Sequence, residues 1–293
     1  MIRLWLPAVL IVFAAAAADA QDPQLRPVVA PPEEPLEPDR PDVTNGSRIV
    51  DTGLLQLEIG ALFTRTSRSQ NTFGSPVTAR LGITEWIEAR IGTDGFLSDV
   101  DAGTRSSGMG NVQVGAKLRL WADPGGVPVL SILPSVNIPS ANADKGLGSG
   151  DADYTVALLT GTDIATRGHV DVNYAIGAIG AGGGLPHFLQ HLVSVSASIA
   201  FTDRWNPYFE GFWFSKVDSF GGPMTAFDFG AIYTVTPRLA IDGGVQLGAS
   251  RAAPDFAAFG GVSVIVGDVL GEHGVRERQR TAEKRARAKA PHH

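Results

Sequence analysis

Between residues 53 and 266 the sequence repeatedly alternates apolar residues with polar or small ones. In the stretch 79–92, for example, Ile87 and Ile91 alternate with Glu88 and Arg90. A period of two predicts β-strands with two unlike faces. The period alone does not say which face points inward. The apolar face is the core of a soluble barrel, whereas in an outer-membrane barrel it faces lipid.

We predict twelve such strands, an even number, from the positions at which the alternation starts and stops. They lie at about 53–64, 76–83, 86–93, 110–121, 127–138, 154–162, 168–178, 190–201, 206–214, 225–235, 238–248 and 256–266.

The predicted connections alternate in length along the chain. Short ones are centred on 84–85, 122–126, 165–166, 203–204 and 236–237, and long ones cover about 65–75, 94–109, 139–153, 179–189, 215–224 and 249–255. Short turns at one end and longer loops at the other are typical of an up-and-down transmembrane barrel. A β-sandwich with Greek-key connections would not keep this alternation.

The composition of the two faces favours a membrane barrel over a soluble one. The polar faces are rich in glycine and serine, which suits a crowded interior, and Lys117 is the exception in strands that otherwise lack lysine. Aromatic residues gather near both ends of the strands, as in the interfacial bands of membrane proteins. The alternative is a soluble β-core with ordinary aromatic caps.

The regions outside the barrel differ from it in composition. Residues 1–20 carry Arg3, an apolar run and small residues before a cleavage point after Ala20, which is typical of a secretory signal. Residues 21–42 contain seven prolines and predict an extended periplasmic linker. The predicted barrel covers 43–267. A basic tail, 268–293, is expected to be solvated or to contact anionic lipid or cell-wall polymer.

Charged residues on the polar faces form two predicted groups in the lumen. A mixed cluster lies on the first four strands, and an acidic wall lies on later strands. Arg80 is expected to face Arg90 directly, with Glu58 and Glu88 offsetting their repulsion. The groups could orient or filter a solute, or they could be a structural network that fills a narrow barrel. The cluster is Glu58, Arg80, Glu88, Arg90, Lys117 and Arg119, and the wall is Asp171, Glu210, Asp228 and Asp242.

Neither catalysis nor a metal or other cofactor is expected. The histidines have no partner at metal-ligand spacing. His191 and Ser194 are the one pair that could serve a hydrolase, but an odd spacing places them on opposite faces of a strand. The absence of cysteine rules out a disulfide framework. An exported chain is also not expected to bind nucleic acid.

The stretch 39–66, DRPDVTNGSRIVDTGLLQLEIGALFTRT, resembles the start of a bacterial outer-membrane transporter family labelled "MetA-pathway of phenol degradation". The resemblance extends to about residue 266, with further echoes at 150–155, 202–210 and 235–245. It departs at the end, where no aromatic residue closes the last strand. The motif residues are Asp39, Arg40, Pro41, Asp42 and Thr44, then Gln56, Glu58 and Gly60.

The resemblance implies an outer-membrane barrel with a transport role. Together with the strand pattern it predicts an all-β, antiparallel, up-and-down barrel of twelve strands, with termini and short turns in the periplasm. We expect passive passage of a small aromatic or hydrophobic solute. The alternatives are a structural barrel with a plugged lumen and, after it, an outer-membrane enzyme. Expected partners are outer-membrane lipid and the barrel-assembly machinery.

Overall fold

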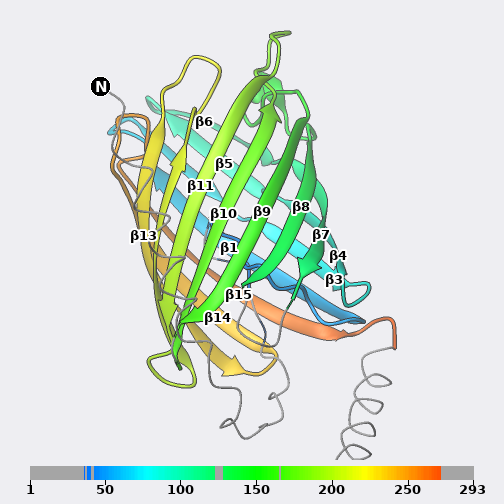
Figure 1. Cartoon of the computed structure of the whole chain (residues 1–293). Coiled ribbons are helices and arrows are strands. Elements are labelled where there is room, and N and C mark those ends of the chain that lie inside the picture. The colour runs from blue at the N-terminus through cyan, green and yellow to red at the C-terminus, as the bar shows by residue number, and fades with distance from the viewer. Residues whose placement is uncertain (1–35, 37, 41–42, 123–127, 165, 272–293) are drawn as a thin grey trace, which may run out of the picture.

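The computed structural model describes residues 36, 38–40, 43–122, 128–164 and 166–271. These residues form one antiparallel sheet that closes on itself, because the last strand pairs with the first (Figure 1). The described part contains no helix that is long and apolar enough to span a bilayer. Its single helix is a short 3₁₀ turn, η1 (Ala143–Lys145).

The first half of the barrel contains β1 (Leu54–Arg65), β2 (Gln70–Gly74), β3 (Val77–Gly82), β4 (Ile87–Thr93), β5 (Phe96–Asp101), β6 (Thr104–Met109), β7 (Val112–Trp121) and β8 (Val129–Ile138). The second half contains β9 (Asp153–Ile164), β10 (Gly168–Ile179), β11 (Phe188–Ile199), β12 (Trp205–Phe214), β13 (Met224–Thr236), β14 (Leu239–Gly248) and β15 (Phe256–Asp268).

The fifteen described strands form twelve barrel-spanning strands, which we call staves, because three staves each consist of two shorter strands in line. Twelve staves confirm the predicted strand number. Three staves are each broken once, between β2 and β3, β4 and β5, and β6 and β7. At the second break Gly95 has a φ of 67°, and a Cβ there would lie 1.9 Å from the carbonyl oxygen of Ser75. Glycine is therefore required at this break, where the backbones of two neighbouring staves approach closely.

Two of the predicted long loops are wrong. Residues 65–75 contain β2, and residues 94–109 contain β5 and β6, so only residues 66–69 and 102–103 remain as turns. Ala102 and Gly103, with φ of 47° and 85°, form a tight two-residue hairpin turn. The polar, serine- and aspartate-containing sequence of these strands resembles a loop, but cross-strand pairing overrides that local preference.

The barrel is polar inside and apolar outside. On β4 the side chains of Ile87 and Ile91 are 40% and 54% exposed, whereas Glu88 is 0% exposed. A soluble core would reverse these values, so the alternative of a soluble barrel is wrong and the apolar face is the lipid face. The largest fully buried side chains are mostly polar: Arg80, Lys117, Gln56, Glu58, Glu88, Glu210 and Asp228, with Leu159 the apolar exception.

Exposed aromatic side chains lie near both ends of the staves. Trp86, Trp121 and Trp205 lie at the ends joined by short turns, and Phe63 and Phe73 lie near the opposite rim. Aromatic rings at these two levels match the two interfaces of a bilayer.

Candidate functional site: the lumen and its N-terminal plug

The chain before β1 runs through the barrel interior. The backbone N–H of Val43 donates to Glu210 on β12 (3.0 Å), and that of Val50 donates to Glu88 on β4 (2.8 Å). Between these two points, Ser131 on β8 donates to the carbonyl of Ser47 (2.6 Å). Because β4 and β12 lie on opposite sides of the barrel, this segment crosses the lumen. We call the described residues 38–40 and 43–52 the N-terminal plug.

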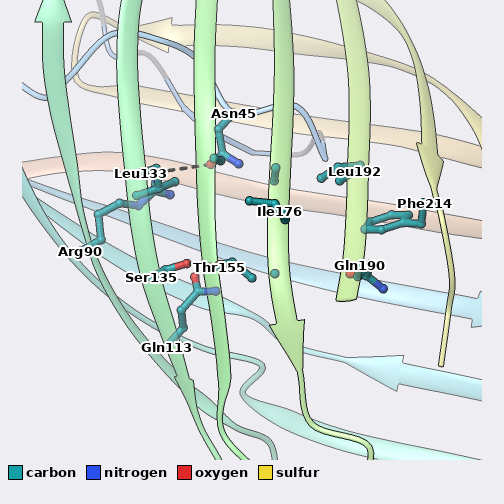
Figure 2. A pocket seen from close by; sticks show the side chains of 13 residues that line it. Asn45, Arg90, Gln113, Leu133, Ser135, Thr155, Ile176, Gln190, Leu192 and Phe214 are labelled. Atoms are coloured by element: carbon teal, nitrogen blue, oxygen red, sulfur yellow. Dashed lines mark hydrogen bonds between the residues drawn. The ribbon is translucent and has the colours of Figure 1, made fainter. Parts of the chain in front are cut away.

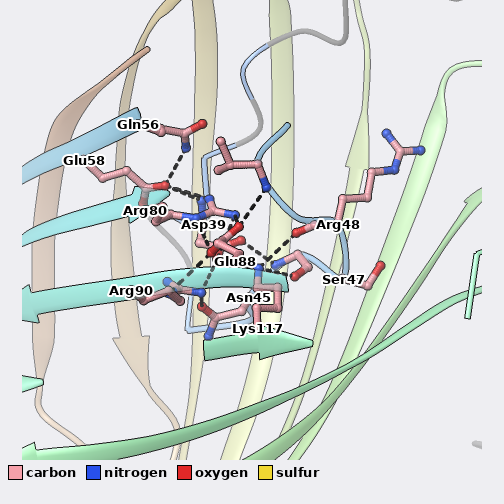
Figure 3. A network of polar contacts seen from close by, with 12 residues as sticks. Asp39, Asn45, Ser47, Arg48, Gln56, Glu58, Arg80, Glu88, Arg90 and Lys117 are labelled. Atoms are coloured by element: carbon pink, nitrogen blue, oxygen red, sulfur yellow. Dashed lines mark hydrogen bonds and ion pairs between the residues drawn. The ribbon is translucent and has the colours of Figure 1, made fainter. Parts of the chain in front are cut away.

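Asp39 anchors the plug to one wall (Figure 3). Its Oδ2 accepts hydrogen bonds from Arg90 Nη1 (2.6 Å) and Lys117 Nζ (2.7 Å), and it lies 3.5 Å from Arg80 Nη2. Burial alone would raise the pKa of Asp39, but Arg80, Lys117 and Arg90 together hold that pKa well below its usual range. The carboxylate is therefore charged and shared among three cations from three neighbouring strands.

Two strand carboxylates complete the same network. Arg80 faces Arg90 in register, as predicted from the turn length. Arg80 lies 2.8 Å from Glu58 Oε1 and 2.9 Å from Glu88 Oε1, so the two glutamates offset the facing guanidiniums. With Asp39 the network holds three carboxylates and three cations, Arg80, Arg90 and Lys117, and has no net charge.

The remaining predicted lumen residues lie outside this network. Arg119 lies two residues beyond Lys117 on the same face, and within the described residues it makes no ion pair. On the acidic wall, Glu210 and Asp228 face each other in register, and Glu210 also accepts hydrogen bonds from Thr44 of the plug. The role of all these residues in function stays a prediction.

The other two acidic-wall residues each face a basic side chain. Asp242 Oδ1 lies 3.8 Å from Nη2 of Arg40 in the plug. Asp171 lies 3.0 Å from His169 Nε2 on its own strand. The plug therefore joins the two walls, because its carboxylate meets the basic side while its N–H groups and one arginine meet the acidic side.

Glycines of the first and last staves make room for the plug. The Arg40 guanidinium lies directly over Gly60, where a Cβ would be 2.0 Å from Arg40 Nη1. It also lies over Gly261, and Arg40 Nη2 donates to the carbonyl of Gly260 (3.2 Å). The motif residues Arg40 and Gly60 thus contact each other, and the glycine leaves space for the guanidinium. Pro41 and Asp42 of the motif lie outside the described residues.

The plug begins before the predicted end of the linker. Leu36 is buried and its N–H donates to the carbonyl of Pro237 (3.2 Å), and Asp39 is buried in the network. Part of the predicted linker therefore contacts the barrel, and the linker boundary at residue 42 stays a prediction. The prolines indicate an extended chain. They do not show that this chain is held in one place, which happens here because the barrel strands satisfy its polar groups. The predicted signal, most of the linker and residues 272–293 lie outside the described residues.

A cavity of about 220 Å³ lies beside the plug, near the long-loop ends of β8 to β12 (Figure 2). Its walls differ in character. Arg90, Gln113 and the plug residue Asn45 supply polar groups from one side. Leu133, Leu192 and Phe214 supply apolar groups from β8, β11 and β12. The same strands and β9 also add the polar side chains Ser135, Thr155 and Gln190, so the cavity is amphipathic.

Comparison with known proteins identifies the family. The family described as "Putative MetA-pathway of phenol degradation" matches residues 38–265. The chain belongs to this family. The match starts at the plug and not at β1, so the plug is part of what the family shares. No curated protein matches the chain.

Solved outer-membrane channels share the fold of this family member. An outer-membrane channel from Pseudomonas putida F1 is 12% identical, with a TM-score of 0.58 over 78% of this chain and 99% of that one. The NanC porin is 11% identical, with a TM-score of 0.52 over 72% of this chain and 100% of that one. At such low identity the likeness establishes the architecture alone, an outer-membrane β-barrel.

Sequence reasoning missed the central role of Asp39 and the place of Asn45 beside the cavity. Neither lies on a strand, so the period-two pattern says nothing about them. The motif that carries the family resemblance includes Asp39, and this was the available signal. The strands that follow the motif carry more lumen cations than carboxylates. An acidic motif residue ahead of them is therefore a candidate for the buried partner that these cations lack.

Proposed function

We propose that the protein is a passive outer-membrane channel for a small solute that has an apolar body and one polar group. The amphipathic cavity beside the plug carries this proposal, since its lining combines hydrogen-bonding groups with aliphatic and aromatic side chains. Its volume of about 220 Å³ suits a compound with a single ring. Pockets for drug-sized ligands are larger, roughly 300–1,000 Å³.

The family description and the likeness to the Pseudomonas putida channel support the same function. The first refers to phenol degradation and the second to an outer-membrane channel. A phenol-like compound has the ring and the single polar group that the cavity would accommodate.

We propose an orientation with the short turns and both termini in the periplasm and the long loops outside. Short periplasmic turns and longer external loops are the general pattern of bacterial barrels. The cavity would then open toward the outside, with the plug between it and the periplasm. Outer-membrane lipid and the barrel-assembly machinery would be the partners of such a chain.

The second candidate is a structural barrel that conducts nothing. The neutral, fully paired network between plug and walls favours it, because such a network can hold the lumen shut. An enzyme is the weakest candidate. Ser194 is buried on the lumen face, whereas His191 lies on the lipid face and hydrogen-bonds with Tyr174 Oη (2.8 Å).

Solute uptake into liposomes tests the proposal. We expect the wild-type chain to admit benzoate, kept ionised so that it does not cross lipid unaided, faster than glucose. Ala175→Phe places a ring in the cavity and is expected to lower benzoate uptake about tenfold, as a constriction of the path would. Ala178→Phe is the matched control, because Ala178 lies in register with lipid-facing Tyr154 and Leu189.

The control variant should behave like the wild type. If benzoate enters wild-type liposomes no faster than protein-free ones, the structural barrel is the correct candidate. If Ala175→Phe leaves uptake unchanged, the cavity is not on the path.

A further inference from the structure

The outward surface of the barrel carries very little charge. In an antiparallel sheet, residues in register share a face, so the register separates lumen-facing from lipid-facing positions. Across the described strands, the lipid-facing set contains two residues of the types Asp, Glu, Lys and Arg: Arg65 on β1 and Arg105 on β6. All other charged strand residues of the described part face the lumen.

These two arginines lie in one row. Arg65 is in register with Asn71 on β2, Asn71 with Val100 on β5, and Val100 with Arg105. Neighbouring strands are about 4.8 Å apart, so three steps place the two Cα atoms roughly 14 Å from each other. We call this set the arginine row. It lies beside the turns 66–69 and 102–103, at the long-loop rim.

The arginine row lies immediately beyond the apolar band. Phe63 lies two residues before Arg65 on the same face, and its register partner Phe73 lies two residues after Asn71; both are exposed. Farther down, exposed Phe96 and Met109 are in register with each other. The row therefore stands where hydrocarbon gives way to headgroups.

Neither arginine is neutralised by the protein. Among the described residues, no carboxylate forms an ion pair with Arg65 or Arg105. The two acidic residues of β5, Asp99 and Asp101, lie on the other face of the sheet by register, and Asp99 accepts from Thr72 Oγ1 (2.8 Å). The Arg65 side chain is held in place, since its guanidinium lies 6.0 Å from the centroid of Phe256 and its Nε donates to Asn71 Oδ1 (3.4 Å).

We propose that the arginine row binds the phosphate groups of a phosphorylated glycolipid in the outer leaflet. A guanidinium forms paired, charge-assisted hydrogen bonds with phosphate. Two unneutralised guanidiniums at headgroup level, above a surface that packs against acyl chains, match an anionic lipid in both charge and position. The proposal rests on the orientation given above, in which the long-loop rim faces outward, but not on solute passage.

Native mass spectrometry of the full chain in detergent tests the row, with a bisphosphorylated lipid A as the probe. We expect the wild type to retain this lipid and to bind the dephosphorylated form weakly. Arg65→Gln with Arg105→Gln should weaken binding about a hundredfold, roughly tenfold for each lost charged contact. Arg204→Gln, in the turn at the opposite rim, is the matched control and should bind as the wild type does.

A variant that keeps the charge guards against effects on folding. Arg65→Lys with Arg105→Lys should recover part of the binding, and heat-dependent gel migration should show all variants folded. Equal binding of the dephosphorylated lipid, or wild-type binding by the glutamine variant, would overturn the proposal. Equally tight binding of phosphatidylglycerol to the row would refute the assignment to the outer-leaflet glycolipid. Because the assay measures lipid in detergent, its result is independent of whether the lumen conducts.

Discussion

Asp39→Asn is expected to lower the free energy of unfolding of the barrel by about 3–5 kcal/mol, the usual effect of removing one partner of a buried ion pair. The reason is the charge count of the network. Without this carboxylate, Arg80, Arg90 and Lys117 share only Glu58 and Glu88, which leaves one buried positive charge unmatched. The asparagine keeps the shape of the side chain, so the loss reports charge and not volume.

Urea unfolding in lipid vesicles measures the effect of this substitution. Asp101→Asn is the matched control, because Asp101 is exposed beside the 102–103 turn and its substitution should change stability by less than about 0.5 kcal/mol. If Asp39→Asn is as stable as the wild type, the plug is not held by this carboxylate. The network would then contribute little to the free energy of unfolding.

Val114→Arg is expected to destabilise the barrel by roughly 2–4 kcal/mol or to block its assembly, the effect of a cation at the lipid-facing midplane. Val114 is in register with Ile91 and Val136 on the outward face, near the middle of the stave formed by β6 and β7. Its neighbour Gln113 lines the lumen cavity, so Gln113→Arg should fold and keep near wild-type stability.

Refolding yield and heat-dependent gel migration compare the two arginine variants. The pair separates the two faces of one strand at the same depth, so general intolerance of arginine would affect both. Equal behaviour of the two would contradict the assignment of the apolar face to lipid. A reversed order would mean that the apolar face is a protein core.

The regular part of the fold was predictable from sequence because it depends on local alternation. Ile87 and Ile91 alternate with Glu88 and Arg90, and the same period defines the other staves. Register follows from turn length, so even the facing of Arg80 and Arg90 could be predicted. Which face points inward was predicted from two features: the glycine and serine content of the polar face, and the aromatic bands at both ends of the strands.

The plug was not predictable because its order depends on partners far away in sequence. Val43 and Thr44 are held by Glu210, and Ser47 is held by Ser131. Such contacts leave no period in the segment itself, and its prolines match those of a linker. The strands β2, β5 and β6 were missed for a related reason, because their polar composition imitates a loop until a neighbouring strand pairs with them.

Single-channel conductance in planar bilayers tests the central claim most directly, by comparing the wild type with a chain that lacks residues 38–50. The deleted residues supply Asp39, Thr44 and Ser47, which bind the plug to the adjacent strands β7 and β8 on one side of the lumen and to β12 on the other. We predict small, stable current steps for the wild type and steps several-fold larger for the folded deletion variant. Equal conductance of the two chains would contradict a lumen narrowed by its own N-terminal segment.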